Sequence, residues 1–228
     1  MLKSDQTIAA NTELVKGVSI YLCDLDTDSD IPLSFAQSLL SPSEHARAKR
    51  FHFERDQKRF IRGRGFLRYH LSKRTGIPAG QIHLEEGERG KPFCPESQIH
   101  FNLSHSRNIA VLALSPFAPI GIDIEFIDRK VDVHGLSRTC FNASECAVLS
   151  SLTGDDLHRR FFAFWTAKEA RMKLTGEGMS LAPKSISLAL ENGRPVGYLL
   201  PEHPTATLNF VELPIPGMVC CTATLSQQ

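Results

Sequence analysis

The sequence lacks the features that mark several classes of protein. Its six cysteines form no C-x-x-C pair, and none stands with histidines at the spacing of a zinc site. The most apolar stretch, residues 109–122, is interrupted by Ser115, Pro116 and Pro119 and is too short to cross a bilayer. The N-terminus has no apolar segment of the kind found in a secretory signal. We therefore expect reduced cysteines, a cytoplasmic location and no membrane partner.

The chain also lacks an excess of either charge, because 26 Lys and Arg residues balance 25 Asp and Glu residues over 228 positions. This balance excludes a uniformly basic nucleic-acid coat, and a hydrophobic content of 42% excludes global disorder. The balance conceals one basic block. Residues 41–75 hold 11 cations and three acids, a net charge of 11 − 3 = +8. Such a block suits a polyanion or an acidic protein partner, and a solvated helix face is the alternative.

The chain resembles itself at a spacing of about 100 residues. Ser43-Glu44 matches Ser144-Glu145, the stretch 56–69 matches 156–172, and both stretches lead into Thr-Gly. An apolar strand, a glycine-containing turn and a possible hairpin follow in each half. The shared order predicts a tandem duplication of one α+β unit, with halves at residues 1–118 and 119–228 and a cleft between them.

The local patterns agree with an α+β fold built on mainly antiparallel sheets. Ser43 is expected to cap a helix that begins near Glu44. Longer helices are expected over 55–74 and from Asp155 or Asp156 to 174, the second ended by Gly176. Strands are expected at residues 19–22, 81–84, 99–103, 110–115, 121–126, 185–190, 207–212 and 219–225.

Asp123 and Glu125 stand two residues apart in the β-branched run that begins at Ile120. A strand places both carboxylates on one face, with Ile122 and Ile124 on the other. Adjacent carboxylates repel unless one is protonated or a cation lies between them. Magnesium prefers such oxygen ligands, together with substrate phosphates. The alternative is a charged edge strand that discourages pairing between sheets.

Two further segments carry candidate chemistry. A helix over residues 161–173 places Trp165, Lys168, Glu169 and Lys173 on one side, where Glu169 could be a third metal carboxylate and Lys173 a cation for phosphate. The alternative is a surface ion pair beside a core tryptophan. Residues 102–106 are expected to form a turn whose amides could hold a phosphate, and no G-x-S-x-G motif marks a hydrolase serine there.

Taken together and in this order, these pieces resemble one family, the 4′-phosphopantetheinyl transferases of the surfactin-synthetase-activating (Sfp) type. The resemblance spans roughly residues 43–190 and is carried by Arg64-Gly-Phe-Leu-Arg68, Gly90-Lys-Pro92, Phe101-Asn-Leu-Ser-His-Ser106, Gly121-Ile-Asp-Ile-Glu125 and Trp165-Thr-Ala-Lys-Glu-Ala-Arg-Met-Lys173. It implies a tandem α+β fold, and transfer of the phosphopantetheine arm of coenzyme A to a serine hydroxyl of a carrier protein, with adenosine 3′,5′-bisphosphate as the other product.

The resemblance also implies the roles of individual residues. Asp123, Glu125 and Glu169 are expected to bind Mg²⁺, and Asp123, Glu169 and Lys173 are the expected catalytic residues. The expected coenzyme A contacts are Arg59, Arg64, Lys91, Ser104, His105, Lys168 and Lys173.

The partners implied are acidic acyl or peptidyl carrier proteins, docked on residues 129–149 or on the basic helix around 47–55, with the chain acting as a monomer. Two rival functions remain. A metal-dependent phosphohydrolase would use the same carboxylates without coenzyme A or a carrier. A nucleic-acid-binding module would show steep salt dependence and indifference to Glu169→Gln.

Overall fold

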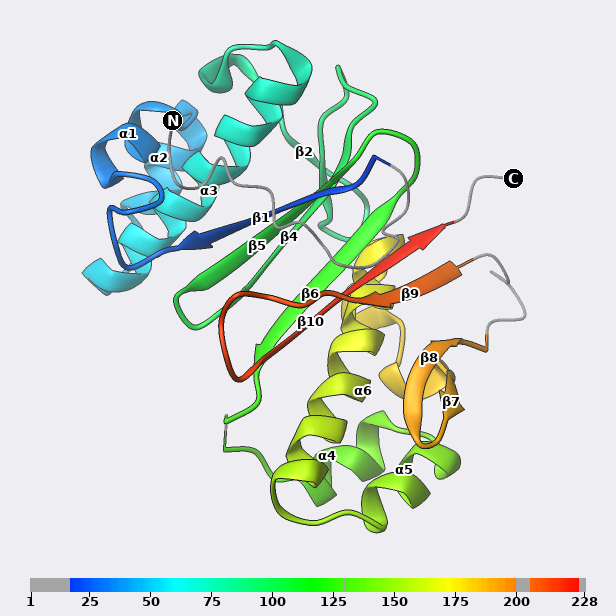
Figure 1. Cartoon of the computed structure of the whole chain (residues 1–228). Helices are drawn as coiled ribbons and strands as arrows, with labels where there is room; N and C mark the ends of the chain where they lie inside the picture. The colour runs from blue at the N-terminus through cyan, green and yellow to red at the C-terminus, as the bar shows by residue number, and fades with distance from the viewer. Residues whose placement is uncertain (1–16, 129, 200–205, 226–228) are drawn as a thin grey trace.

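The computed structural model describes residues 17–128, 130–199 and 206–225. It contains two similar halves, each with a three-stranded antiparallel sheet and one long helix (Figure 1). The first half has the strand order β1-β5-β4 and the helix α3, and the second half has the order β6-β10-β9 and the helix α6. Their bounds are Ser19–Asp24 (β1), Glu54–Thr75 (α3), His100–Ser106 (β4), Ile109–Ser115 (β5), Ile120–Phe126 (β6), Gly154–Thr175 (α6), Ala206–Phe210 (β9) and Met218–Leu225 (β10). The α+β class and the duplication are confirmed.

Shorter elements complete each half, and here the sequence expectations were less accurate. The strand expected at 81–84 is absent from the described structure, where a 3₁₀ turn over Ala79–Gln81 is followed by irregular chain over residues 82–84. The strand expected at 185–190 begins three residues later. The remaining elements are α1 (Leu33–Ser38), α2 (Pro42–Ala48), β2 (Glu85–Glu86), β3 (Pro92–Phe93), α4 (Val133–Cys140), α5 (Ala143–Ser150), 3₁₀ turns at Gly178–Ser180 and Pro183–Ser185, β7 (Leu188–Glu191) and β8 (Arg194–Tyr198).

The helix ends follow capping chemistry, although one cap differs from the expected residue. Ser41, not Ser43, caps α2: its hydroxyl accepts a hydrogen bond from the main-chain N–H of Glu44, and the Glu44 carboxylate accepts from the N–H of Ser41. Asn142 and Glu145 form the same capping box at α5. The helix α6 starts at Gly154, so Asp155 and Asp156 lie in its first turn and favour its positive end.

Three buried clusters form the core. One packs α3 against the first sheet and a second packs α6 against the second sheet. The third contains residues of both sheets, including Ile20, Val111 and Ile122, so the halves share apolar core. Cys220 belongs to this shared cluster and Cys221 to the α6 cluster, because adjacent residues of a strand face opposite sides of the sheet. All six cysteines are free, and no helix in the described part of the chain is long and apolar enough to span a membrane.

The halves meet where β4 lies beside β6 (Figure 1). Lys91 reaches across this junction, and its ammonium donates hydrogen bonds to the main-chain oxygens of Ile120 (2.8 Å) and Leu174 (2.9 Å). Arg89 adds an ion pair with Glu177 at 3.0 Å. Burial lowers the pKa of Lys91 to about 8. The side chain of Lys91 thus ties the first half to both β6 and the end of α6.

Replacing Gly121 with alanine is expected to lower the free energy of unfolding by about 3 kcal/mol or more, because a methyl group there overlaps the main chain of α6 at Ala170 and Leu174. Urea unfolding measures this loss. Gly80→Ala is the matched control, since a methyl group at Gly80 meets no atom within 4 Å. Equal stability of the two variants would contradict the close packing of α6 on β6.

Candidate active site

Asp123 lies at the centre of a polar cluster on the face of β6 that is turned toward α6. Its side chain is only 7% exposed. Its Oδ1 accepts hydrogen bonds from the Ser104 hydroxyl (2.9 Å) and the Lys173 ammonium (2.6 Å). Lys173 also donates to the Ser104 oxygen at 2.8 Å. The other carboxylate oxygen of Asp123, Oδ2, is buried and has no hydrogen-bond partner among the described residues, which is costly for a buried polar atom unless a metal ion or a substrate donor contacts it.

Glu125 stands two residues further along the same face, as the strand alternation predicted. Its Oε2 accepts a hydrogen bond from the Ser106 hydroxyl at 2.8 Å. The partners Ser104 and Ser106 belong to β4, so residues 102–106 form part of a strand and not the expected phosphate-holding turn. Both serine hydroxyls are directed at carboxylates of the other half.

Glu169 and Lys173 are one turn apart on α6, and both are partly buried. Burial raises the pKa of Glu169, the negative charges of Asp123 and Glu125 raise it further, and the Lys173 ammonium opposes them. The two β6 carboxylates therefore act electrostatically on Glu169. The structure brings together Ser104, Asp123, Glu125, Glu169 and Lys173 from β4, β6 and α6.

The donor set of this cluster fits a magnesium ion. Carboxylate oxygens are the ligands that Mg²⁺ prefers, and the partnerless Oδ2 of Asp123 is available for one. As the side chains stand, no three acidic, histidine or cysteine groups among the described residues are close enough to hold a metal. Lys173 and Ser106 each engage one carboxylate oxygen instead.

A pocket of about 510 Å³ lies next to this cluster, between α3 and the end of β4. Its lining includes Asp56, aliphatic residues, and the basic and aromatic side chains of Arg47, Phe51, Arg59, Phe60, Arg64, His105 and Arg107. Burial lowers the pKa of His105, and the charges of Lys173 and Arg59 lower it further. His105 lines the pocket and is adjacent along β4 to Ser104 of the carboxylate cluster.

The expected contacts Arg59 and Arg64 both line this pocket. Arg59 makes two hydrogen bonds to Asp26, at 2.7 and 2.6 Å, and Arg64 is 3.9 Å from Glu44. Arg47 and Arg107 were not expected here. The basic block contained Arg47 but did not distinguish it, and nothing local in the sequence marked Arg107.

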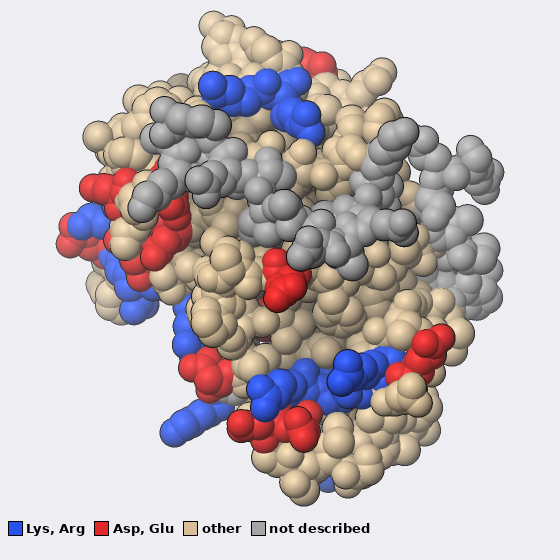
Figure 2. Space-filling view, viewed as in Figure 1, with Lys and Arg blue, Asp and Glu red and all other residues tan. Residues whose placement is uncertain are grey.

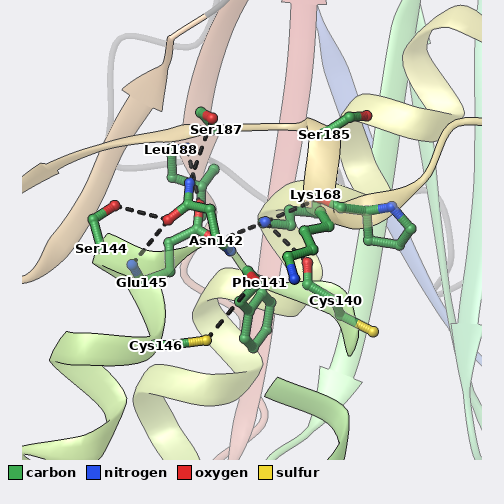
Figure 3. A network of polar contacts seen from close by, with 12 residues as sticks. Cys140, Phe141, Asn142, Ser144, Glu145, Cys146, Lys168, Ser185, Ser187 and Leu188 are labelled. Atoms are coloured by element: carbon green, nitrogen blue, oxygen red, sulfur yellow. Dashed lines mark hydrogen bonds and ion pairs between the residues drawn. The ribbon is translucent and has the colours of Figure 1, made fainter. Parts of the chain in front are cut away.

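Two expected coenzyme A contacts are not brought to the carboxylate cluster. The ammonium of Lys91 is engaged at the junction between the halves. Lys168 is fully buried and belongs to a different polar network (Figure 3). Its ammonium lies 2.6 Å from the Glu145 carboxylate and donates to the main-chain oxygens of Cys140 and Pro183. Burial lowers the pKa of Lys168, and the carboxylate of Glu145 opposes this effect.

The basic block is partly neutralised within the fold. Cations of this block pair with acids within 4 Å: Arg55, Lys58, Arg59, Arg62, Arg64 and Arg68. On the face that Figure 2 shows, basic side chains lie among acidic ones. Among these acidic partners, only Asp26 and Asp28 come from outside residues 41–75, so the block keeps most of its positive charge.

Comparison with known proteins covers both halves. Residues 27–117 match the family described as 4′-phosphopantetheinyl transferase, N-terminal, and residues 119–223 match the 4′-phosphopantetheinyl transferase superfamily. The chain is 39% identical over 173 residues to the 4′-phosphopantetheinyl transferase HetI of Nostoc sp., which covers 73% of each chain. This chain belongs to the 4′-phosphopantetheinyl transferase family.

Relatives from other bacteria agree with this assignment. The 4′-phosphopantetheinyl transferase psf-1 of Bacillus pumilus is 33% identical over 186 residues, 80% of this chain and 78% of the relative. The 4′-phosphopantetheinyl transferase Sfp of Bacillus subtilis is 30% identical over 190 residues, 82% and 83% of the two chains. The transferase moves phosphopantetheine from coenzyme A to carrier proteins, as the sequence resemblance implied.

Proposed function

We propose that the carboxylate cluster and the neighbouring basic pocket together form the transfer site, with Mg²⁺ as the metal. The observation that supports this most directly is the buried, partnerless Oδ2 of Asp123 beside Glu125 and Glu169. In this proposal Asp123, Glu125 and Glu169 hold the metal. Magnesium, when bound, supplies positive charge against the pyrophosphate oxygens.

The basic pocket suits the nucleotide end of coenzyme A. Its 3′-phosphate needs cations away from the metal, and Arg47, Arg59 and Arg64 supply them on one wall. Phe51 and Phe60 add aromatic surface for a base. His105 and Ser104 then lie between this phosphate and the pyrophosphate, in line with the roles implied by the family resemblance.

Lys173 and Glu169 are assigned separate tasks in the reaction. The serine oxygen of the carrier bonds to the phosphorus that bears the pantetheine arm, and adenosine 3′,5′-bisphosphate leaves. Lys173, now held by Asp123 and Ser104, donates to the phosphate oxygens as charge develops there. Glu169 accepts the serine proton, directly or through a water.

Two surfaces suit an acidic carrier, at the two places expected from sequence, although the first is mainly the loop between α2 and α3 and not the expected helix. Phe53 is 62% exposed between α2 and α3, close in sequence to Arg50 and Arg55, and Phe51 in the same loop lines the basic pocket. The second surface, α4 and α5 within residues 129–149, exposes Leu136; Arg129 lies outside the described residues. Reversing the charge of Arg50 or of Arg138 distinguishes the two surfaces. Only the substitution on the surface that docks the carrier is expected to raise the KM for the carrier.

Three further expectations accompany this proposal. One chain carries both walls of the site, which supports a monomer as the active unit. The six free thiols favour a reducing compartment and hence a cytoplasmic location. The boundary between residues 118 and 119 stays a prediction, supported by the short link from β5 to β6.

The proposal is tested by mixing the protein with Mg²⁺, coenzyme A and several apo carrier proteins, and weighing the carriers by mass spectrometry. We expect a gain of one phosphopantetheine arm that requires Mg²⁺ and is lost in Asp123→Asn. Calorimetry of coenzyme A binding is run in parallel. Transfer that persists in Asp123→Asn would overturn the assigned site, whereas phosphate release from coenzyme A without a carrier would favour the phosphohydrolase.

A further inference from the structure

Every second residue of one segment of β4 is polar, buried and directed at β6. Asn102, Ser104 and Ser106 are 6%, 4% and 7% exposed. The Ser104 hydroxyl donates to Asp123, and the Ser106 hydroxyl donates to Glu125 at 2.8 Å. These contacts join the two halves, because β4 belongs to the first sheet and β6 to the second.

The side chains of β4 replace the backbone ladder that is missing between these two strands. The main-chain N–H of Ile122 donates to Oδ1 of Asn102 at 2.8 Å, and the N–H of Phe126 donates to the Ser106 oxygen at 3.4 Å. Without them, inner N–H groups of β6 would face this junction unsatisfied. The register of β6 against the first half is therefore fixed on both sides of Asp123 and Glu125.

The Ser106 hydroxyl has a fixed direction for its proton. A hydroxyl has one donor, and its oxygen can accept as well. The Ser106 oxygen accepts from Phe126, so the proton is directed to Oε2 of Glu125. The hydrogen bond occupies one carboxylate oxygen and orients the plane of the group.

The next residue anchors the same end of β6. Arg107 has a left-handed backbone with a φ of 53°, a conformation that a residue with a side chain adopts at some energetic cost. Its guanidinium lies 4.6 Å from the centre of the Phe126 ring and 2.7 Å from the Asp128 carboxylate. The tip of the β4–β5 hairpin thus contacts the chain directly after Glu125.

We propose that Ser106 is a positioning residue of the transferase: from the first half, its hydroxyl orients the Glu125 carboxylate of the second half for metal binding. This inference rests on the proposed function, in which Glu125 is a metal ligand. Hydrogen-bond partners of metal ligands commonly contribute to affinity in this way, and their removal typically weakens binding by about 10–100-fold. Each half then contributes to the metal site, although the carboxylates come from the second half alone.

The test measures Mn²⁺ binding by electron paramagnetic resonance in the presence of coenzyme A and without a carrier, so that no turnover occurs. Ser106→Ala is expected to raise the Kd for Mn²⁺ about tenfold or more, and Ser106→Thr, which keeps the hydroxyl, to restore it to within about threefold of the unmodified protein. Ser150→Ala is the matched control, since its hydroxyl bonds only to the main chain of α5 at Cys146 in the described structure. In steady-state assays the KM for Mg²⁺ should rise with kcat largely retained at saturating Mg²⁺.

A parallel variant, Glu125→Gln, separates this inference from the proposed function. Unchanged Mn²⁺ binding in Glu125→Gln would overturn the carboxylate metal site itself. Weakened binding in Glu125→Gln together with unchanged binding in Ser106→Ala would overturn the positioning role alone. If Ser106→Ala fails to fold, Ser106→Cys keeps the side-chain shape at a slightly larger volume with a weaker donor, and Mn²⁺ affinity equal to that of the unmodified protein would count against the inference.

Discussion

Replacing Glu169 with glutamine is expected to lower the rate of phosphopantetheine transfer by about 10²–10³-fold, the range found when one preorganised group that stabilises the transition state is removed. Glutamine keeps the size of the side chain but can neither accept the serine proton nor supply a negative charge to the metal. The buried position of Glu169 beside Asp123 and Glu125 makes both losses large. The measurement is the initial rate of carrier modification, followed by mass.

The control is Glu191→Gln, which removes a carboxylate at the exposed end of β7 and should leave the rate unchanged. Binding of coenzyme A is measured for both variants, because the basic pocket does not include Glu169. We expect coenzyme A binding to weaken by much less than the rate falls, since the pocket for the nucleotide end is unaltered. A Glu169→Gln enzyme with more than a tenth of the normal rate would remove Glu169 from the catalytic assignment.

The carboxylate strand is the part of the site that sequence predicted best. Two acids separated by one β-branched residue allow few arrangements in a strand, and Ile122 and Ile124 lie in the apolar cluster between the sheets as the alternation requires. The period of two thus determined the face of Asp123 and Glu125 without knowledge of the topology.

Lys168 shows where such periodicity is insufficient. Helical spacing groups Lys168 with Glu169 and Lys173, yet adjacent residues project about 100° apart. That difference is enough to direct Lys168 to Glu145 and Glu169 to the β6 carboxylates. Which of two adjacent charged residues faces the site depends on the contacts of α4 and α5, and no local pattern indicated those helices.

The β4 segment and Lys91 show a second limit. A serine-rich stretch around a histidine reads locally as a turn, but here the serines satisfy polar groups of another strand. Lys91 similarly contacts carbonyl groups at positions 120 and 174 of the chain. Contacts between the halves depend on how the two halves pack together. The repeat in the sequence predicts the two halves but not their relative placement.

The duplication includes one buried ion pair in each half, which no local sequence pattern predicted. In the first half, the capping-box residue Glu44 lies 2.5 Å from Arg68 of α3. In the second half, Glu145 lies 2.6 Å from Lys168 of α6. Each carboxylate thus joins a short helix to the long helix of its own half. Arg68 and Lys168 also donate to main-chain oxygens nearby. The same kind of buried ion pair therefore holds the short helix to the long helix in both halves.

Removing the charge of Glu145 is expected to cost about 3–5 kcal/mol of unfolding free energy, because a buried ammonium is left without its counter-ion. The Glu145 and Lys168 side chains are 0% and 1% exposed, so water cannot replace the lost carboxylate charge. Glu145→Gln also weakens the acceptor for the N–H groups of Asn142 and Leu188 (Figure 3). The measurement is urea unfolding followed by the fluorescence of Trp165, the single tryptophan, which packs on the α6 core.

Two variants separate the ion pair from other effects of the substitution. The double variant Glu145→Gln/Lys168→Met is expected to lose less stability than the sum of the single variants, because the second change removes the buried charge that the first leaves unpaired. The exposed pair of Glu54 and Lys58, at 2.7 Å with side chains 75% and 43% exposed, is the matched control, and Glu54→Gln should cost less than about 1 kcal/mol. Similar losses in Glu145→Gln and Glu54→Gln would mean that Lys168 finds water or another acceptor when Glu145 is absent, and that the pair does not hold α5 to α6.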